Sequence, residues 1–225
     1  MPERRRLVIL GRWPAPGRCK RRLAGSLGLR GAAALQARLT SHVLETASQA
    51  CAGTIELHLA AAGLGPGARA RWALELPAAL ITDQGGGSLG MRLRRQVVRA
   101  HRQGVVSLVM IGSDLPELAV EDLQDAFRTL ADGAPLVLGP AVDGGYWLIG
   151  LDLHRPARPE RQNRWPRRGE AAGVRLFAGA EAAIRWGSER VREQTLRAAE
   201  REGMAATLLG MRADLDRPSD LRRWR

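Results

Sequence analysis

A short loop near the start of the chain gathers the side chains best suited to holding phosphate. It spans residues 12–22 and sets Gly17 among five cations: Arg12, Arg18, Lys20, Arg21 and Arg22. A polyphosphate needs several donors held close together and a backbone that can approach it, and this loop offers both. Lys20 is the only lysine in the chain, which suggests that a compact ammonium is needed there. The alternative is a solvated basic loop in an arginine-rich protein.

Two aspartates offer oxygen ligands for a metal. Asp114 follows the most hydrophobic segment of the chain, and Asp143 stands beside Gly144 and Gly145. Mg²⁺ and Mn²⁺ prefer oxygen donors and usually share them with substrate phosphates. Asp114 is therefore a candidate metal ligand, with a turn or cap role as its alternative. For Asp143 the alternative is a tight Asp-Gly turn.

Further along, residues 214–220 place alternate carboxylates in an extended segment ahead of a short helix. Asp220 in this segment has the position of a helix cap rather than of a ligand.

The elements that must position these residues follow from the hydrophobic pattern. Strands are predicted at residues 7–11, 54–61, 80–82, 105–112, 136–139, 146–151 and 205–209. Helices are predicted at 31–50, 88–103 with Ser88 as its cap, 120–130, 188–202 and 218–224. Residues 64–79 give no clear pattern beyond one or two helical turns at 71–76. Strands that alternate with helices predict an α/β fold with a mostly parallel sheet.

In such a sheet, ligands bind beyond the carboxyl ends of the strands. The rule selects the loop 12–22 and three turns, at 84–88, 112–116 and 140–146. We expect these segments to meet at one edge of the sheet.

Length and composition favour one domain. The chain has 225 residues, of which 45% are hydrophobic, so it can bury a full core and is not globally disordered. We predict a single Rossmann-like domain over residues 1–225, with a central sheet flanked by helices. Residues 154–173 carry many arginines and prolines and few aliphatic residues, which predicts a mobile basic insertion.

Cysteine usage and hydropathy limit the compartment and the class. Cys19 and Cys51 lie far apart, without the spacing of a disulfide framework or a structural zinc site. No segment approaches the roughly 18 uninterrupted apolar residues of a membrane helix. We expect a cytoplasmic protein with no membrane partner.

The net charge of +12 fits either a polyanionic partner or the arginine bias of a GC-rich coding sequence. Single-strand binders need aromatic platforms among their basic residues, whereas aromatic residues make up only 4% of this chain. Nucleic acid is therefore the less favoured partner.

Five segments in order resemble one known family: LVILGRWPAPGRCKRRL, QGGGSLGMRL, VMIGSDLPEL, LVLGPAVDGGYWLIGL and DLDRPSDL. They are similar to a family of bacterial glycosyltransferases with the glycosyltransferase A-type (nucleotide-diphospho-sugar transferase) fold, some members of which are associated with arsenosugar biosynthesis. The resemblance is strong over residues 7–151 and looser over 185–221.

The resemblance implies a divalent metal, Mg²⁺ or Mn²⁺, and a nucleotide or nucleotide sugar as ligand. It implies that the basic loop holds phosphates and that the turn 84–87 approaches the base or ribose. Asp114 and Asp216 would then be metal ligands, and Asp143 and Tyr146 would lie by the acceptor or the transferred group. The implied catalytic residues are Lys20, Asp114 and Asp143. The implied substrate-binding residues are Arg12, Gly17, Arg18, Arg22, Gln84, Gly85, Gly86, Gly144, Gly145 and Tyr146.

The chain departs from the family pattern at a few positions. Arginine stands at 12 where the family commonly has lysine, and Arg21 and Arg217 replace threonines. A forked guanidinium differs from an ammonium, so substrate geometry can differ. Most of the insertion 154–173 is also absent from the family pattern, and it is either a lid over the donor or a linker.

These observations predict a metal-dependent transferase that moves a glycosyl group from a nucleotide diphosphate sugar to a small-molecule acceptor. A nucleotidyltransferase that joins a nucleoside triphosphate to a phosphorylated acceptor is the alternative in the same fold. A basic, non-catalytic RNA-binding module that uses residues 155–168 is the alternative from another class. The sequence identifies neither the sugar, the base, the acceptor, the general base nor the oligomeric state.

Overall fold

The computed structural model describes residues 3–75, 79–155, 172–180 and 184–224. Its centre is a seven-stranded sheet with the order β3-β2-β1-β4-β6-β5-β7. The strands are β1 (Arg5–Arg12), β2 (Glu56–Ala62), β3 (Leu80–Asp83), β4 (Ser107–Gly112), β5 (Leu136–Pro140), β6 (Tyr146–Asp152) and β7 (Ala206–Leu208). The predicted α/β fold with a mostly parallel sheet is confirmed.

The pairing of β6 is the exception to the parallel arrangement. It lies between β4 and β5 and runs antiparallel to both, whereas the pairs β1–β2, β1–β4, β2–β3 and β5–β7 are parallel. The carboxyl ends of the six parallel strands therefore share one edge of the sheet with the start of β6. That edge is where the sequence placed the ligand-binding loops.

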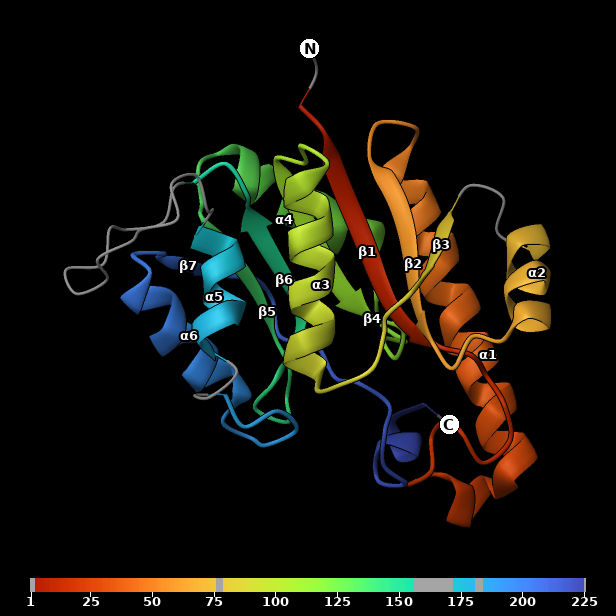
Figure 1. Cartoon of the computed structure of the whole chain (residues 1–225). Helices are drawn as coiled ribbons and strands as arrows, with labels where there is room; N and C mark the ends of the chain where they lie inside the picture. Colours follow the sequence, from red (N-terminus) through yellow and green to blue (C-terminus); the bar gives the residue numbers. More distant parts are fainter. Residues whose placement is uncertain (1–2, 76–78, 156–171, 181–183, 225) are drawn as a thin grey trace.

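Helices cover both faces of the sheet (Figure 1). On one face lie α3 (Leu89–Arg102), α5 (Ala172–Ala180) and α6 (Val191–Arg201), and on the other lie α1 (Ala24–Cys51), α2 (Pro66–Glu75) and α4 (Val120–Ala131). A short 3₁₀ helix, η1 (Asp220–Trp224), ends the described chain.

Alternation along the strands explains the two layers. In β1, Val8 packs into the core cluster on the α3 face, whereas Leu7 and Ile9 pack into the cluster on the α1 face. Successive side chains of a strand point to opposite faces, and apolar residues at every position bury both. The central strands read as continuous apolar runs for this reason.

Helix boundaries differ from the sequence prediction at α1. It begins seven residues before the predicted start at Gly31, and its first turns are set off from the rest by a kink at Gly28, whose φ is 69°. A left-handed residue of this kind breaks the helical hydrogen-bond ladder, so the pattern became clear only beyond it. The predicted cap at Ser88 is confirmed, since its hydroxyl accepts from the Met91 amide at 3.2 Å.

Two further helices were not predicted as such. Where residues 64–79 gave no clear pattern, α2 forms and buries Trp72 as its one anchoring side chain. The predicted basic insertion, residues 154–173, overlaps the start of α5, which begins at Ala172. Ala172 and Gly173 are both buried. Residues 156–171 of that insertion lie outside the described residues.

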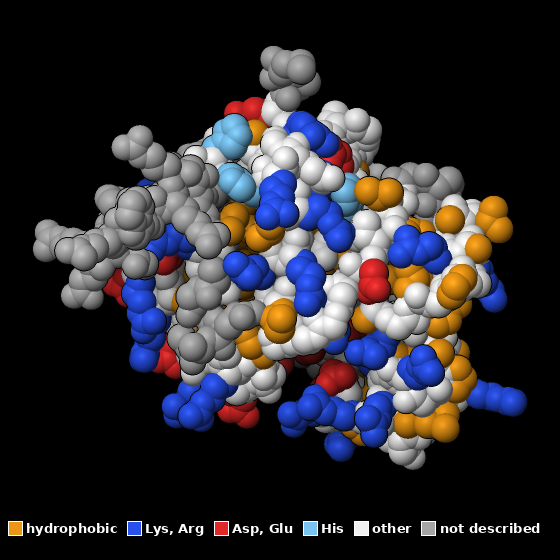
Figure 2. Space-filling model, in the orientation of Figure 1, with side chains coloured by type: hydrophobic (Ala, Val, Ile, Leu, Met, Phe, Trp, Pro, Cys, Tyr) orange, Lys and Arg blue, Asp and Glu red, His pale blue; other side chains and the backbone are white. Residues whose placement is uncertain are grey.

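Basic side chains are spread over the surface, and several lie along α3 (Figure 2). That helix carries Arg92, Arg94, Arg95, Arg99 and Arg102 and no acidic residue. Within the part of the chain that the structure describes, no helix has the length and apolarity needed to cross a membrane.

Candidate functional site

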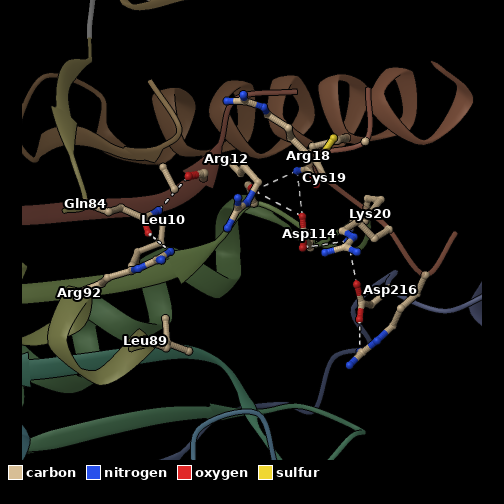
Figure 3. A pocket seen from close by; sticks show the side chains of 17 residues that line it. Leu10, Arg12, Arg18, Cys19, Lys20, Gln84, Leu89, Arg92, Asp114 and Asp216 are labelled. Atoms are coloured by element: carbon tan, nitrogen blue, oxygen red, sulfur yellow. Dashed lines mark hydrogen bonds and ion pairs between the residues drawn. The ribbon is translucent and has the colours of Figure 1, made fainter. Parts of the chain in front are cut away.

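A cavity of about 810 Å³ opens at the carboxyl ends of β1, β3 and β4. The loop after β1, the turn after β3 and the turn after β4 form most of its wall, and α1, the start of α3 and the C-terminal segment complete it. Figure 3 shows Gln84, Leu89 and Arg92 at one end, and Lys20 and Asp216 at the other. Arg12 and Asp114 lie between these ends.

Lys20 is the most enclosed cation of this cavity. Its side chain is only 1% exposed, and its ammonium lies 2.8 Å from Asp114 Oδ2 and 4.0 Å from Asp216 Oδ1. It also donates to the carbonyl of Leu215. The backbone of Lys20 has a φ of 45°, a conformation that costs a side-chain-bearing residue roughly 1–2 kcal/mol. The ion pairs hold the ammonium in the wall despite that cost.

The C-terminal segment reaches the cavity through two links. Leu215 donates its amide to the Asp114 carbonyl at 3.2 Å, and Asp216 Oδ2 accepts from Arg22 at 2.5 Å. Asp220 lies outside this cavity and accepts from the amides of Asp216 and Arg217. Although burial acts to raise it, these hydrogen bonds lower the pKa of Asp220. The amides that Asp220 binds precede it in the chain, so it secures the turn before η1 and is not the cap of that helix that the sequence predicted.

Gln36 of α1 fixes the orientation of Asp114. Its buried amide nitrogen lies 3.0 Å from Asp114 Oδ1 and 3.2 Å from the hydroxyl oxygens of Ser113 and Thr40. Asp114 itself is 39% exposed, so one carboxylate oxygen is held by α1 while the group still faces the cavity.

Gln84 joins the turn after β3 to the centre of the sheet. Its side-chain amide donates to the carbonyls of Gly11 and Ala60, both at 2.8 Å. Its Oε1 accepts from Arg92 at 3.3 Å. Arg95 secures the same turn by donating to the carbonyls of Gln84 and Gly86. The result is a rigid end of the cavity with a guanidinium beside it.

Other predicted residues of the basic loop also line this cavity. Arg12, Gly17, Arg18 and Arg22 belong to its wall, and the three arginines are exposed. The Cys19 thiol lies there as well, and burial raises its pKa. It therefore adds no charge near neutral pH. Gly85 and Gly86 lie in the turn after β3, next to the wall that Gln84 forms.

Asp143 is placed in a second cavity, of about 510 Å³, which shares Arg22 and Asp216 with the first. Its Oδ1 accepts from the Gly145 amide at 2.9 Å. Gly144 has a φ of 86°, and a Cβ there would lie 2.1 Å from the carbonyl oxygen of Glu189. The turn after β5 therefore packs directly against the segment that precedes α6.

Asp214 shares that second cavity. Burial, and then the negative charge of Asp143, raise its pKa. Tyr146 at the start of β6 lines neither cavity. It packs against the core cluster on the α3 face, and burial raises the pKa of its hydroxyl. The structure thus separates Asp143 and Tyr146 from the Lys20–Asp114 pair.

The donor set fits a divalent metal of the kind that phosphate substrates bring with them. Asp114 and Asp216 both approach the Lys20 ammonium, so two carboxylates already share one cation. Mg²⁺ is commonly held by one or two carboxylates together with substrate phosphates. Across the described ranges, no group of three or more His, Cys, Asp or Glu side chains gathers as a complete metal site.

Sequence reasoning missed Gln36, Arg92 and Ser113 as members of this site. Gln36 looked like one more polar residue of a long helix, and its role appears only when α1 packs beside the end of β4. Arg92 had a weak signal, because it stands in the first turn of the helix that follows the Gly-rich turn 84–88. Ser113 adjoins Asp114, and nothing distinguished it from a turn residue.

Comparison with known proteins places the chain in a family. Residues 43–166 match the family model described as "Uncharacterized protein conserved in bacteria (DUF2064)". The chain belongs to this family. A search of curated proteins found no match.

Solved structures share the fold over the whole length. A candidate nucleotide-diphospho-sugar transferase from Desulfovibrio desulfuricans G20 has a TM-score of 0.76 at 25% identity, covering 99% of this chain and 86% of that one. A 4-diphosphocytidyl-2C-methyl-D-erythritol synthase from Anaerococcus prevotii has a TM-score of 0.61 at 9% identity, covering 98% and 94%. Glucosyl-3-phosphoglycerate synthase from Mycobacterium tuberculosis, in complex with Mn²⁺ and UDP, has a TM-score of 0.54 at 16% identity, covering 98% and 75%.

Proposed function

We propose that this protein is a metal-dependent transferase that moves a glycosyl group from a nucleotide diphosphate sugar to a small-molecule acceptor. One observation carries the proposal. The cationic loop, Asp114 and Asp216 converge on a single cavity at the carboxyl ends of the parallel strands. Fold neighbours that include a candidate nucleotide-diphospho-sugar transferase and a UDP-bound glucosyl-3-phosphoglycerate synthase support it.

The geometry suggests how a nucleotide would lie. Gln84 and Arg92 form the end of the cavity that suits the base and ribose, and the basic loop forms the part that suits the diphosphate. The exposed guanidinium groups of Arg12, Arg18 and Arg22 can each donate to phosphate oxygens. Asp143, in the adjoining cavity, is on the side from which an acceptor would approach.

Charge stabilisation is the main chemical task in such a reaction. When the bond between the sugar and the diphosphate breaks, negative charge develops on the departing diphosphate. Hydrogen-bond donors already fixed around that group lower the barrier. A divalent metal held by Asp114 and Asp216 would neutralise part of that charge. The ion pairs of Lys20 and Arg22 keep these two carboxylates at the same wall of the cavity.

Nucleotidyl transfer is the second candidate, because a 4-diphosphocytidyl-2C-methyl-D-erythritol synthase is among the fold neighbours. It would use the same phosphate loop, with a nucleoside triphosphate as donor. Release of pyrophosphate from a triphosphate in the presence of a phosphorylated acceptor would favour this activity over glycosyl transfer. The RNA-binding alternative concerns residues 155–168, nearly all of which lie outside the described residues.

A thermal-shift panel tests the proposal. The protein is melted with nucleotide sugars, diphosphates and triphosphates, each with and without Mn²⁺. A ligand at 100 times its Kd stabilises the folded state by about 2.7 kcal/mol, or roughly 5–10 °C for a chain of this size. We expect one nucleotide sugar to shift the wild type only with metal.

Two variants sharpen the panel. Asp114→Ala should fold with a lowered melting temperature, because buried Lys20 loses its close partner, and it should lose the metal-dependent shift. Asp125→Ala, which removes an exposed carboxylate of α4 paired with Arg128, should keep the shift. Equal shifts by every polyanion, erased by salt, would refute the transferase proposal and leave non-specific binding to a basic surface.

A further inference from the structure

The ammonium of Lys20 is engaged by oxygens of the protein itself in this structure. It bonds to Asp114 Oδ2 and to the carbonyl of Leu215, and it approaches Asp216 Oδ1. Two of its three donors therefore have protein acceptors, and Asp216 Oδ1 adds an ion-pair contact at 4.0 Å. The lysine that the sequence assigned to phosphate therefore serves the protein itself in the ligand-free state.

Lys20 contacts the carboxylate oxygens of Asp114 and Asp216 that Gln36 and Arg22 do not bind. Asp114 Oδ1 is held by Gln36, and Asp216 Oδ2 is held by Arg22. Asp114 Oδ2 and Asp216 Oδ1 are the remaining oxygens, and both face the Lys20 ammonium. The ammonium thus lies against the two carboxylates that would hold a divalent metal.

A divalent metal and this ammonium cannot share that position. A metal held by Asp114 and Asp216 would lie close to the ammonium, and like charges a few ångströms apart in a partly buried site repel strongly. Removing the cation without replacing it is also unfavourable, because two carboxylates would then face each other in a partly desolvated wall. Exchange of one cation for another avoids both costs.

We propose that Lys20 is an internal counter-ion that holds Asp114 and Asp216 together in the free protein and is exchanged for a divalent metal when substrate binds. This inference rests on the proposed function and adds a rule for how its site is loaded. Lys20 lines the same cavity as Arg12 and Arg18, so a rotation of its side chain carries the released ammonium toward the diphosphate.

The exchange makes metal and nucleotide depend on each other. Metal alone must displace the ammonium from two anchoring oxygens and leave it without a partner, so it binds weakly. Metal together with a nucleoside diphosphate gives the ammonium a new anionic partner. By linkage, each ligand then raises the affinity for the other by the same factor.

Because Lys20 is the only lysine, its exposure can be measured directly. Reductive methylation with isotope-labelled formaldehyde modifies primary amines, and peptide mass mapping separates Lys20 from the α-amine of the chain, which normalises the reagent dose. The probes are Mn²⁺ alone and Mn²⁺ with UDP, ADP or CDP, at constant pH.

We expect slow modification of Lys20 in the free protein and at least tenfold faster modification when Mn²⁺ alone saturates the protein. Adding the nucleoside diphosphate that binds should restore protection. Asp114→Asn should release Lys20 without any metal, and the matched change Asp125→Asn on exposed α4 should leave it protected.

Unchanged Lys20 reactivity in the presence of saturating Mn²⁺, or in Asp114→Asn, would overturn the exchange. These outcomes separate it from the proposed function. If a nucleotide sugar still raises the melting temperature only with metal while Lys20 stays protected throughout, the transferase proposal stands and the exchange fails. If no nucleotide shifts the melting temperature, the proposed function itself fails.

Discussion

Gln36 donates a hydrogen bond to Asp114 across 78 residues of sequence, with 3.0 Å between the amide nitrogen and Oδ1. The glutamine is buried, and the hydroxyls of Thr40 and Ser113 lie near the same amide. Asp114 is therefore oriented by α1, although it stands on the turn after β4. In metal sites, loss of a partner that orients a ligand typically costs about 10- to 100-fold in affinity, so Gln36 would be a positioning residue for the proposed ligand Asp114.

Replacing Gln36 by leucine should reduce metal-dependent nucleotide affinity about 10- to 100-fold. The free energy of unfolding should fall by only about 1–2 kcal/mol, because a few buried hydrogen bonds are lost. Isothermal titration at fixed Mn²⁺ gives the affinity, and urea denaturation gives the stability. Thr40→Val removes one partner of the glutamine without touching Asp114, so it should lose stability but keep its affinity. Equal affinities for wild type and Gln36→Leu would contradict the positioning role.

Arg92 should contribute to nucleotide binding from the end of the cavity that Gln84 forms. A charge-assisted hydrogen bond contributes about 1.5–3 kcal/mol, so Arg92→Met should weaken binding roughly 10- to 100-fold. Discrimination among bases should weaken as well, because a guanidinium carries donors only and selects for acceptor edges. Arg94→Met, two residues along α3 and outside the cavity lining, is the matched control. Competition binding with UDP, CDP, ADP and GDP measures both effects.

Two glycines with positive φ should respond differently to alanine. Gly144→Ala places a Cβ 2.1 Å from the Glu189 carbonyl oxygen, a backbone atom that cannot rotate away, whereas Gly17 has open space around the corresponding position. We expect Gly17→Ala to cost about 1 kcal/mol of stability, from its backbone conformation alone. Gly144→Ala should cost more than about 3 kcal/mol, in the range of strongly disruptive changes. Chemical denaturation of both variants checks the order, and similar losses would show that the turn adjusts.

His58 on β2 should make the fold sensitive to mild acid. Burial, followed by the positive charge of Arg6, lowers its pKa to about 4, whereas the unfolded chain titrates near its usual value of about 6.5. The unfolded chain alone takes up the proton between these values. Stability is therefore complete above pH 6.5 and falls as pH drops toward 4, by about 3 kcal/mol in all.

Melting curves between pH 7.5 and 5 should show this loss in the wild type and a flatter profile in His58→Gln. Glu56, which lies nearby, is a control for the pH range in which stability is lost. Burial acts to raise its pKa, but hydrogen bonds from Arg4 and Arg6 lower it overall, so its contribution is lost only at more acidic pH. Parallel profiles for wild type and variant would contradict the assignment to His58.

The strands and the edge where they end could be predicted from the sequence because each depends on a local pattern. Leu7, Val8 and Ile9 form a short apolar run that ends at a Gly- and Pro-rich loop, which favours a buried strand with that loop at its carboxyl end. The place of β6 between β4 and β5 is not local. It depends on which edges pair, and an antiparallel insertion leaves no mark on the hydrophobic pattern of residues 146–151.

The candidate site shows the same division. The chemical types of Lys20, Asp114 and Asp216 could be read from the chain, but their mutual contacts could not, because those depend on how the C-terminal segment returns to the sheet. A lysine predicted to face phosphate is found between two aspartates instead. The role of Gln36 could not be predicted for a related reason, because its partner Asp114 lies on another element.

The contact between Lys20 and the Leu215 carbonyl joins residues 195 positions apart in the sequence. This sequence separation has a consequence for folding. Contacts between such remote segments require closure of a very long loop, so they tend to form after the local and neighbouring-strand contacts. The sheet can therefore assemble while this wall of the cavity is still open. During refolding, nucleotide binding should then recover later than secondary structure. The delay between the two would measure when the C-terminal segment docks.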